Sequence, residues 1–245
     1  RAIQAQRQPG SAFKLFVYLA ALERGLTPAS TVDASRMEFT DGRPIRNFDN
    51  KYPGRLTLAD AFARSTNTAS ARLTQGHAEE VAAVARRLGI ESSLDADLGL
   101  ALGVSEVSPL ELTQAYAAIA NGGYKVDGHL FQRITDPRGR EIYAYGKRTP
   151  ERVVEPDKAA AMKALLARVL RDGTGRLARV SGAAGGKTGT TNDYRDAWFV
   201  GFANGMTVGV WVGNDDNKPM KGVTGGSVPA EIWRTFVTEA ARVKR

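Results

Sequence analysis

The chain contains no cysteine and only two histidines, His77 and His129, among its 245 residues. Without cysteine, a disulfide framework, a thiol nucleophile and a thiolate metal site are all excluded. Two histidines leave little room for a histidine metal centre or for a Ser-His-Asp triad. If the protein is an enzyme that uses a nucleophile, its general base is therefore expected to be a residue other than histidine. Neither a metal ion nor a cofactor is predicted.

Long apolar segments are also lacking, since the longest wholly apolar run, Leu15 to Leu22, is far too short to cross a bilayer. No signal-peptide pattern opens the chain, and Arg1 resembles an internal residue. We therefore expect a fragment whose anchor or targeting segment lies elsewhere in a longer protein. The net charge of +8 favours anionic surroundings such as phospholipid, nucleic acid or acidic wall polymers, but a basic surface that merely keeps the protein soluble explains it equally well.

What the chain does contain is a glycine-rich peptide with one cation and several hydroxyls, Gly185-Gly186-Lys187-Thr188-Gly189-Thr190-Thr191. In a phosphate-binding loop, the lysine opens a helix, and the first glycine of that motif falls where this chain has Ser181. The residues from Thr190 to Phe202 instead indicate a strand, a turn and a second strand. A nucleotide-binding module that uses Gly186-Lys187-Thr188 thus stays a remote alternative, beside a plain glycine-rich hairpin and the inner strand of a serine acyl-transferase.

Ser11 and Lys14 lie at the start of the first predicted helix, within residues 9–25, and their spacing places them on one helical face. A helix cap is sufficient to explain Ser11 alone. Lys14 is less easily explained, because the positive end of the helix dipole and the apolar neighbours Phe13 and Leu15 disfavour its ammonium form. These effects predict a lowered pKa for Lys14, which could then take a proton from the Ser11 hydroxyl.

A second polar pair, Ser65 and Asn67, lies at a junction between two predicted helices. The first of these spans about Leu58 to Arg64, and the next begins near Thr68. Either residue alone is explained as a cap of the second helix. Two residues apart at such a junction, the two side chains can also point into one cavity.

The other expected elements complete an α+β fold, an antiparallel sheet flanked by helices with an inserted all-helical lobe. Residues 26–55 are expected to form loops with short strands. Periodicity predicts helices over 78–88, 109–121, 157–170 and 230–242, and strands over 130–135, 141–145, 197–202 and 206–212. Ser108 and Glu111 predict a capping box at the start of the second of these helices. The first two strands are expected to form a hairpin, and Asn204-Gly205 predicts a hairpin turn between the last two. In the last helix, the inward side chains are expected to be Ile232, Trp233, Phe236 and Val237. The helical lobe is predicted at about 56–122, and the α/β part at 1–55 plus 123–245.

The three polar patterns occur in a meaningful order: Ser11-x-x-Lys14, then Ser65-x-Asn67, then Lys187-Thr188-Gly189-Thr190. They resemble the three motifs that meet in the cleft of the penicillin-recognising serine acyl-transferases. The flanking residues are similar to the transpeptidase domain of bifunctional (class A) penicillin-binding proteins over 7–11, 103–112 and 187–198. The resemblance covers nearly the whole of residues 1–245 and implies a β-lactamase/transpeptidase-like fold. It also implies that N-terminal strands of the family's sheet are missing from this fragment.

The resemblance implies a serine D,D-transpeptidase that cross-links peptidoglycan stem peptides and is acylated by β-lactam antibiotics. In that reaction Ser11 is the nucleophile, Lys14 is its base, and Ser65 passes a proton to the leaving amine. Backbone N–H groups of Ser11 and Thr190 form the oxyanion hole.

The same resemblance implies a set of substrate-binding residues. Asn67 holds the peptide amide of a stem peptide that ends in D-Ala-D-Ala. Lys187, Thr188, Gly189 and Thr190 form the site for its terminal carboxylate, and the Lys187 charge is also expected to lower the pKa of Lys14 by repulsion.

Partners and location are implied as well. The full-length protein is expected at the outer, periplasmic face of the bacterial cytoplasmic membrane, with a membrane anchor and a glycosyltransferase domain, whereas this fragment is expected to be soluble and not to bind nucleic acid.

Two alternative functions share the three motifs. A β-lactamase needs a group that directs water to the acyl-enzyme, and no acidic residue has a local sequence that marks it for this task. A β-lactam sensor is acylated without turning over peptide.

Overall fold

The fold is described by a computed structural model that covers residues 1–146 and 149–243. Its central element is a three-stranded antiparallel sheet in the order β7-β8-β9, formed by β7 (Ala184–Thr190), β8 (Asp196–Ala203) and β9 (Met206–Gly213). The turn between β8 and β9 contains Asn204 and Gly205, with φ angles of 52° and 72°. This left-handed pair is the conformation that an Asn-Gly hairpin favours, so the predicted hairpin is confirmed.

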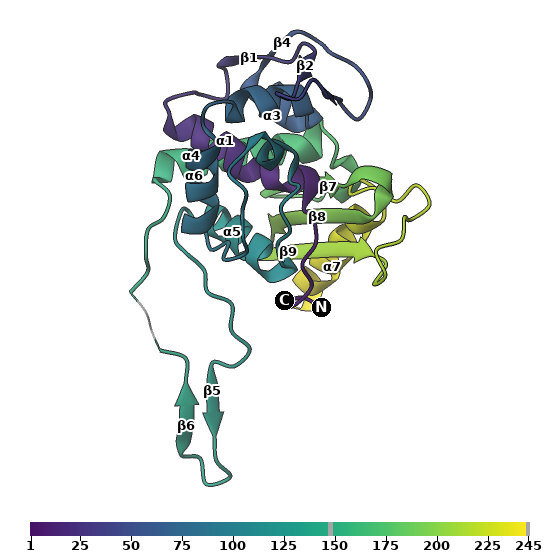
Figure 1. The fold of residues 1–245 in the computed structure, drawn as a ribbon. Helices are drawn as coiled ribbons and strands as arrows, with labels where there is room; N and C mark the ends of the chain where they lie inside the picture. Colours follow the sequence, from purple (N-terminus) through teal and green to yellow (C-terminus); the bar gives the residue numbers. More distant parts are fainter. Residues whose placement is uncertain (147–148, 244–245) are drawn as a thin grey trace.

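Helices cover both faces of this sheet. On one face, α7 (Val228–Val243) packs against β8 and β9, with the Trp233 and Phe199 ring centroids 5.1 Å apart. On the other face lie α1 (Lys14–Glu23), α5 (Pro109–Ala120) and α6 (Pro156–Arg171) (Figure 1). Every residue of α1 from Lys14 to Leu22 is buried. The helix that carries the first motif therefore runs through the core.

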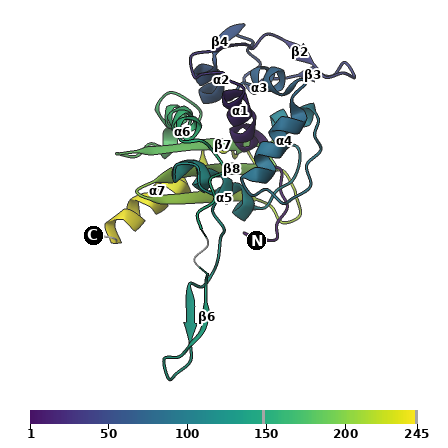
Figure 2. The ribbon, with the colours of Figure 1, turned by 90° about the vertical axis from the view of Figure 1, so that its left-hand side faces the viewer.

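Three further helices precede α5, namely α2 (Leu58–Arg64), α3 (Asn67–Thr74) and α4 (Ala78–Arg87). Figure 2 shows α1 between α2 and α3 on one side and the sheet on the other. The predicted bounds of α2 are confirmed, and α5 begins with the expected capping box between Ser108 and Glu111. The region from residue 26 to 55 contains short strands, as expected. β1 (Thr31–Asp33) pairs with β4 (Arg55–Thr57), and β2 (Met37–Glu38) pairs with β3 (Pro44–Ile45). These pairs lie beyond α3 in Figure 1.

The hairpin predicted after His129 exists but is shorter and differently placed. β5 (Arg133–Thr135) and β6 (Glu141–Ala144) form a separate two-stranded sheet that projects away from the domain (Figures 1 and 2). The prediction that the first strand begins at Leu130 is wrong, and the Leu130 side chain is 90% exposed. Its apolar character gives a strand pattern, although here no core covers it.

The predicted inward face of the last helix is half correct. Trp233 and Val237 are fully buried, whereas Ile232 and Phe236 are 46% and 53% exposed. The apolar stripe of α7 is wider than the part of the helix that contacts β8 and β9. Within 1–146 and 149–243, no helix combines the length and apolar character required to cross a membrane.

Candidate active site

Ser11 lies in a 3-10 turn, η1 (Gly10–Phe13), through which the chain enters α1. Pro9 occupies the cap position of this turn, and no side chain caps it, so a capping role does not explain Ser11. Lys14 is the first residue of α1 and is completely buried. The Ser11-x-x-Lys14 spacing thus spans the change from a 3-10 turn to an α-helix.

Ser11 lines a cleft of about 730 Å³ that is built from distant parts of the chain. Ser65 and Asn67 reach it from the junction of α2 and α3, and Thr188 and Thr190 reach it from β7. The fold therefore brings the three motifs to one place, as the family resemblance implies. Two loops, residues 46–51 and 191–194, form its sides, and the Phe48 and Tyr194 rings meet edge to face with centroids 6.5 Å apart.

The two motif lysines converge on the Ser65 hydroxyl. The Lys14 ammonium donates to Asn67 Oδ1 at 2.6 Å, to the Ser65 carbonyl at 2.6 Å and to Ser65 Oγ at 3.3 Å. The Lys187 ammonium donates to Ser65 Oγ at 2.8 Å and to the Thr188 carbonyl at 3.1 Å. Within the described residues, the hydrogen bonds of the Lys14 ammonium go to Ser65 and Asn67, and none goes to the Ser11 hydroxyl.

The electrostatics of the site follow from burial. Burial first, and repulsion from Lys187 second, hold the pKa of Lys14 well below its ordinary value. Burial lowers the pKa of Lys187 from 10.5 to about 7. The predicted lowering of the Lys14 pKa and the predicted repulsion from Lys187 both agree with the structure, but the main cause is burial in the core. Lys14 therefore reaches its neutral form, which accepts a proton, more easily than an exposed lysine does, whereas Lys187, with a pKa of about 7, keeps part of its charge near neutral pH.

The junction between α2 and α3 presents Ser65 to both lysines. Ser65 ends α2 with a left-handed backbone, φ 59° and ψ 39°. This conformation is strained for a residue other than glycine, and such residues are frequent at functional sites. The cap position of α3 is occupied by Thr66, whose side chain makes no capping hydrogen bond. Ser65 and Asn67 do not occupy that position, so helix capping does not explain them. Their side chains are available to the amines instead.

Gly189 allows β7 to approach the serine turn. A Cβ at this position would lie 2.2 Å from the Pro9 carbonyl oxygen and 3.2 Å from the Ala12 Cβ. Gly10, which has φ 53°, is equally confined, because a Cβ there would lie 2.8 Å from the Thr190 carbonyl oxygen. The glycine of the third motif thus has a steric role, which is to place the strand against η1.

The threonines of β7 are held by residues that the sequence did not reveal. Thr188 Oγ1 lies 2.6 Å from Thr174 Oγ1, and Thr190 Oγ1 accepts the Gly225 N–H at 3.0 Å. Thr174 and Gly225 also belong to loops, where no periodicity or spacing links them to the motifs. Asn47, whose side chain accepts hydrogen bonds from the first turn of α3, was missed for the same reason.

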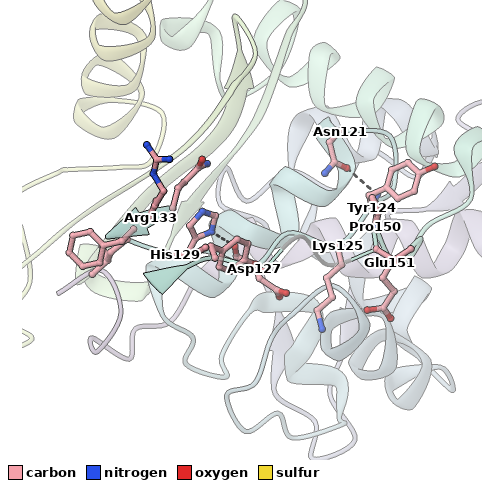
Figure 3. A pocket seen from close by; sticks show the side chains of 15 residues that line it. Asn121, Tyr124, Lys125, Asp127, His129, Arg133, Pro150 and Glu151 are labelled. Carbon is pink, nitrogen blue, oxygen red and sulfur yellow. Dashed lines mark hydrogen bonds between the residues drawn. The ribbon is translucent and has the colours of Figure 1, made fainter. Parts of the chain in front are cut away.

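A larger hollow of about 1700 Å³ lies elsewhere, at the base of the projecting hairpin (Figure 3). In this view His129 and Arg133 lie at one end, and Asn121 and Tyr124 lie at the other. Its polar groups are spread along the two legs of the hairpin, whereas the amines and hydroxyls of the smaller cleft converge on Ser65. We therefore assign the chemistry to the smaller cleft.

The nucleotide-binding alternative is wrong. Lys187 lies in the middle of β7 with a buried side chain, and the chain continues through a short turn into β8. A phosphate-binding loop requires a helix that begins at the lysine. Within residues 1–146 and 149–243, no group of three or more histidine, aspartate or glutamate side chains is placed to hold a metal ion.

Comparisons with known proteins agree with this geometry. The family model described as the penicillin binding protein transpeptidase domain matches residues 1–238. The chain is 38% identical to penicillin-binding protein 1A of Neisseria meningitidis over 264 aligned residues, which cover 100% of this chain and 33% of that protein. It thus spans about a third of the length of the curated relatives that it matches.

Solved structures of similar fold come from the same group of proteins. Penicillin-binding protein 1A from Haemophilus influenzae is 27% identical with a TM-score of 0.90, over 100% of this chain and 43% of that one. The imipenem acyl-enzyme complex of penicillin-binding protein A from M. tuberculosis is 26% identical with a TM-score of 0.85, over 98% of this chain and 62% of that one.

Proposed function

This chain belongs to the penicillin-binding protein transpeptidase family, and we propose that it is a serine D,D-transpeptidase that works through an acyl-enzyme on Ser11. The observation that carries the proposal is the convergence of two buried lysines on one hydroxyl in the cleft that Ser11 lines. A buried, uncharged amine beside a serine supplies the base that such a reaction needs.

The reaction has two steps. Ser11 Oγ attacks the carbonyl carbon of the penultimate D-alanine, and its proton passes to the neutral amine of Lys14. The carbon–nitrogen bond then breaks, and the terminal D-alanine leaves with a proton delivered through Ser65, which accepts a hydrogen bond from Lys14. In the second step, an amine of a neighbouring stem peptide attacks the ester carbonyl, the carbon–oxygen bond to Ser11 breaks, and the proton that the amine loses passes through Lys14 to Ser11 Oγ. The contact between Lys14 and Ser11 forms when substrate binds, since catalytic hydrogen bonds often tighten only in the complex.

The substrate-binding roles follow from position and charge. The Thr188 and Thr190 hydroxyls line the cleft and bind the terminal carboxylate. Lys187 is fully buried beneath them, so it acts on that carboxylate through its charge, and Gly189 keeps the strand close to η1. Asn67 binds the peptide amide. Backbone N–H groups of Ser11 and Thr190 form the oxyanion hole, each worth about 3 kcal/mol in other acyl-transferases.

Further proposals concern β-lactams and the whole protein. A β-lactam acylates Ser11 and stays bound, in agreement with the acyl-enzyme of the similar M. tuberculosis protein. Residues 1–245 form one transpeptidase domain, with a helical part at about 56–122. In the full-length protein, this domain works on peptidoglycan at the periplasmic face of the membrane, together with a glycosyltransferase domain and a membrane anchor. The sequence similarity to penicillin-binding protein 1A supports this arrangement.

The test is transfer of an acyl group from a peptide that ends in D-Ala-D-Ala to a D-amino acid acceptor, followed by mass spectrometry. We expect release of D-alanine and formation of the new amide, and neither product with Ser11→Ala. Rapid turnover of a chromogenic cephalosporin without amide formation would identify a β-lactamase. A stable lactam adduct without peptide turnover would identify a sensor.

A further inference from the structure

The side chain of Asn47 joins the loop beside the cleft to the first turn of α3. Only 5% of this residue is exposed. Its Oδ1 atom accepts the backbone N–H of Asn67 at 2.8 Å and that of Thr68 at 3.1 Å. Its Nδ2 atom donates to the Lys51 carbonyl at 2.7 Å and to Thr68 Oγ1 at 3.3 Å. The amide is therefore held on both sides, in one orientation.

The first turn of α3 depends on this contact. The first N–H groups of any helix lack partners within the helix and need an acceptor from elsewhere. Thr66, at the cap position, makes no side-chain hydrogen bond to them, and Thr68 is completely buried. Asn47 thus caps α3 from a loop that is distant along the chain. Without it, the part-buried N–H of Asn67 and the buried N–H of Thr68 lose their acceptor, which destabilises the start of the helix.

Asn67 connects this cap to the reacting groups. Its backbone N–H is held by Asn47, and its Nδ2 donates to the Arg46 carbonyl at 2.7 Å. These two contacts turn its Oδ1 toward the Lys14 ammonium, 2.6 Å away. The charged group that acts on Lys14 from a neighbouring element is Lys187 on β7. Lys187 repels the Lys14 ammonium, whereas Asn67 Oδ1 and the two oxygens of Ser65 accept its hydrogen bonds. These acceptors hold the Lys14 nitrogen in place.

We propose that Asn47 is a positioning residue of the active site, which fixes the start of α3 so that Asn67 and the adjoining Ser65 hold the Lys14 amine in place. The proposal rests on the function proposed above for Ser11 and Lys14. It adds a residue outside the three motifs, in a loop that touches the cleft.

The main test compares Asn47→Ala with the unaltered chain in the rate of acylation by benzylpenicillin across pH. We expect about a hundredfold slower acylation, because a displacement of about 1 Å at a reacting group has an effect of this size. The acid limb of the profile, where the rate rises as Lys14 loses its proton, should also move to lower pH. The ammonium form of Lys14 is less stable when it loses a hydrogen-bond acceptor, so its pKa falls. Asn47→Asp keeps both accepted hydrogen bonds but loses the two that Nδ2 donates, so it should recover part of the rate.

Thr74→Val is the matched control. Its hydroxyl donates to the Ser70 carbonyl at 3.1 Å and is equally buried, but it lies at the other end of α3. This variant should lose thermal stability while its acylation rate and acid limb stay unchanged. A purely structural role for Asn47 predicts that Asn47→Ala behaves like Thr74→Val.

Titration of Lys14 by NMR of ¹³C-labelled lysine provides a readout without a lactam. We expect the Lys14 midpoint to fall in Asn47→Ala and to stay unchanged in Thr74→Val. If the unaltered chain is not acylated, the proposed function fails, and this titration still decides the role of Asn47. An unchanged Lys14 midpoint, or an Asn47→Ala rate within twofold of the unaltered chain, overturns the proposal. If Asn47→Ala does not fold, a folded Asn47→Asp that is a hundredfold slower overturns it as well.

Discussion

Replacement of Lys187 by methionine should make the protein more stable while it damages the active site. Lys187 is completely buried, and burial lowers its pKa from 10.5 to about 7. Methionine has a similar length and flexibility but carries no charge. The lysine is thus expected to reduce stability and to be present for function, as is common for active-site residues.

The size of the effect follows from the pKa. A change from 10.5 to about 7 corresponds to about 5 kcal/mol, at about 1.4 kcal/mol for each pH unit. Methionine cannot make the hydrogen bonds to Ser65 Oγ and the Thr188 carbonyl, so the net gain in unfolding free energy should be about 3 kcal/mol at pH 6. Below pH 7, Lys187 is protonated in both the folded and the unfolded chain, so the folded protein bears the full cost of burying its charge. Between pH 7 and 10.5, the unfolded chain alone holds the Lys187 proton, so the stability of the unaltered protein rises by about 1.4 kcal/mol per pH unit and overtakes that of the variant at about pH 9.

Urea unfolding followed by tryptophan fluorescence at pH 6, 8 and 10 measures this gap. We expect Lys187→Met to be more stable than the unaltered chain at pH 6 and less stable by about 1 kcal/mol at pH 10. Lys221→Met, which removes an exposed lysine, should leave the unfolding free energy nearly unchanged at each pH. A Lys187→Met variant that is less stable at pH 6, or a gap that does not change with pH, would refute the reasoning.

Three other predictions concern the same region. Gly189→Ala should slow penicillin acylation at least tenfold and lower the unfolding free energy by about 2 kcal/mol, because its Cβ would lie 2.2 Å from the Pro9 carbonyl oxygen; unchanged kinetics would disprove this steric role. In Lys187→Met, the acid limb of acylation should move to higher pH, since the loss of repulsion raises the pKa of Lys14; a shift to lower pH would contradict it. Asp60→Ala should lower the melting temperature through loss of about 1 kcal/mol, because it breaks the partly exposed ion pair between α2 and α6; an unchanged melting temperature would show that the pair contributes nothing.

Local signals were sufficient for much of the fold. The bounds of α2, the capping box of α5 and the Asn204-Gly205 hairpin each depend on a few neighbouring residues, and each was predicted correctly. The motifs of the site were predictable for the same reason, because each consists of adjacent residues. Their meeting in one cleft could be expected only from the family resemblance.

Contacts between distant residues could not be predicted in this way. Asn47 accepts a hydrogen bond from Asn67, but it lies in a loop whose path has no sequence signal. Thr174, in the loop after α6, likewise contacts Thr188 on β7 without any spacing that links the two. Periodicity likewise gave an apolar stripe on the last helix but not the width of the surface that it meets, so Phe236 was wrongly placed inside. The pKa of a lysine depends on how deeply the whole fold buries it.

The most direct test of the account is the identity of the residue that a β-lactam acylates. The chain is incubated with a fluorescent penicillin and digested, and the labelled peptide is identified by mass spectrometry. We predict a single adduct on Ser11, none in Ser11→Ala, and much slower labelling in Lys14→Ala. An adduct on Ser65, the serine whose hydroxyl contacts both lysines in the structure, would contradict the assignment.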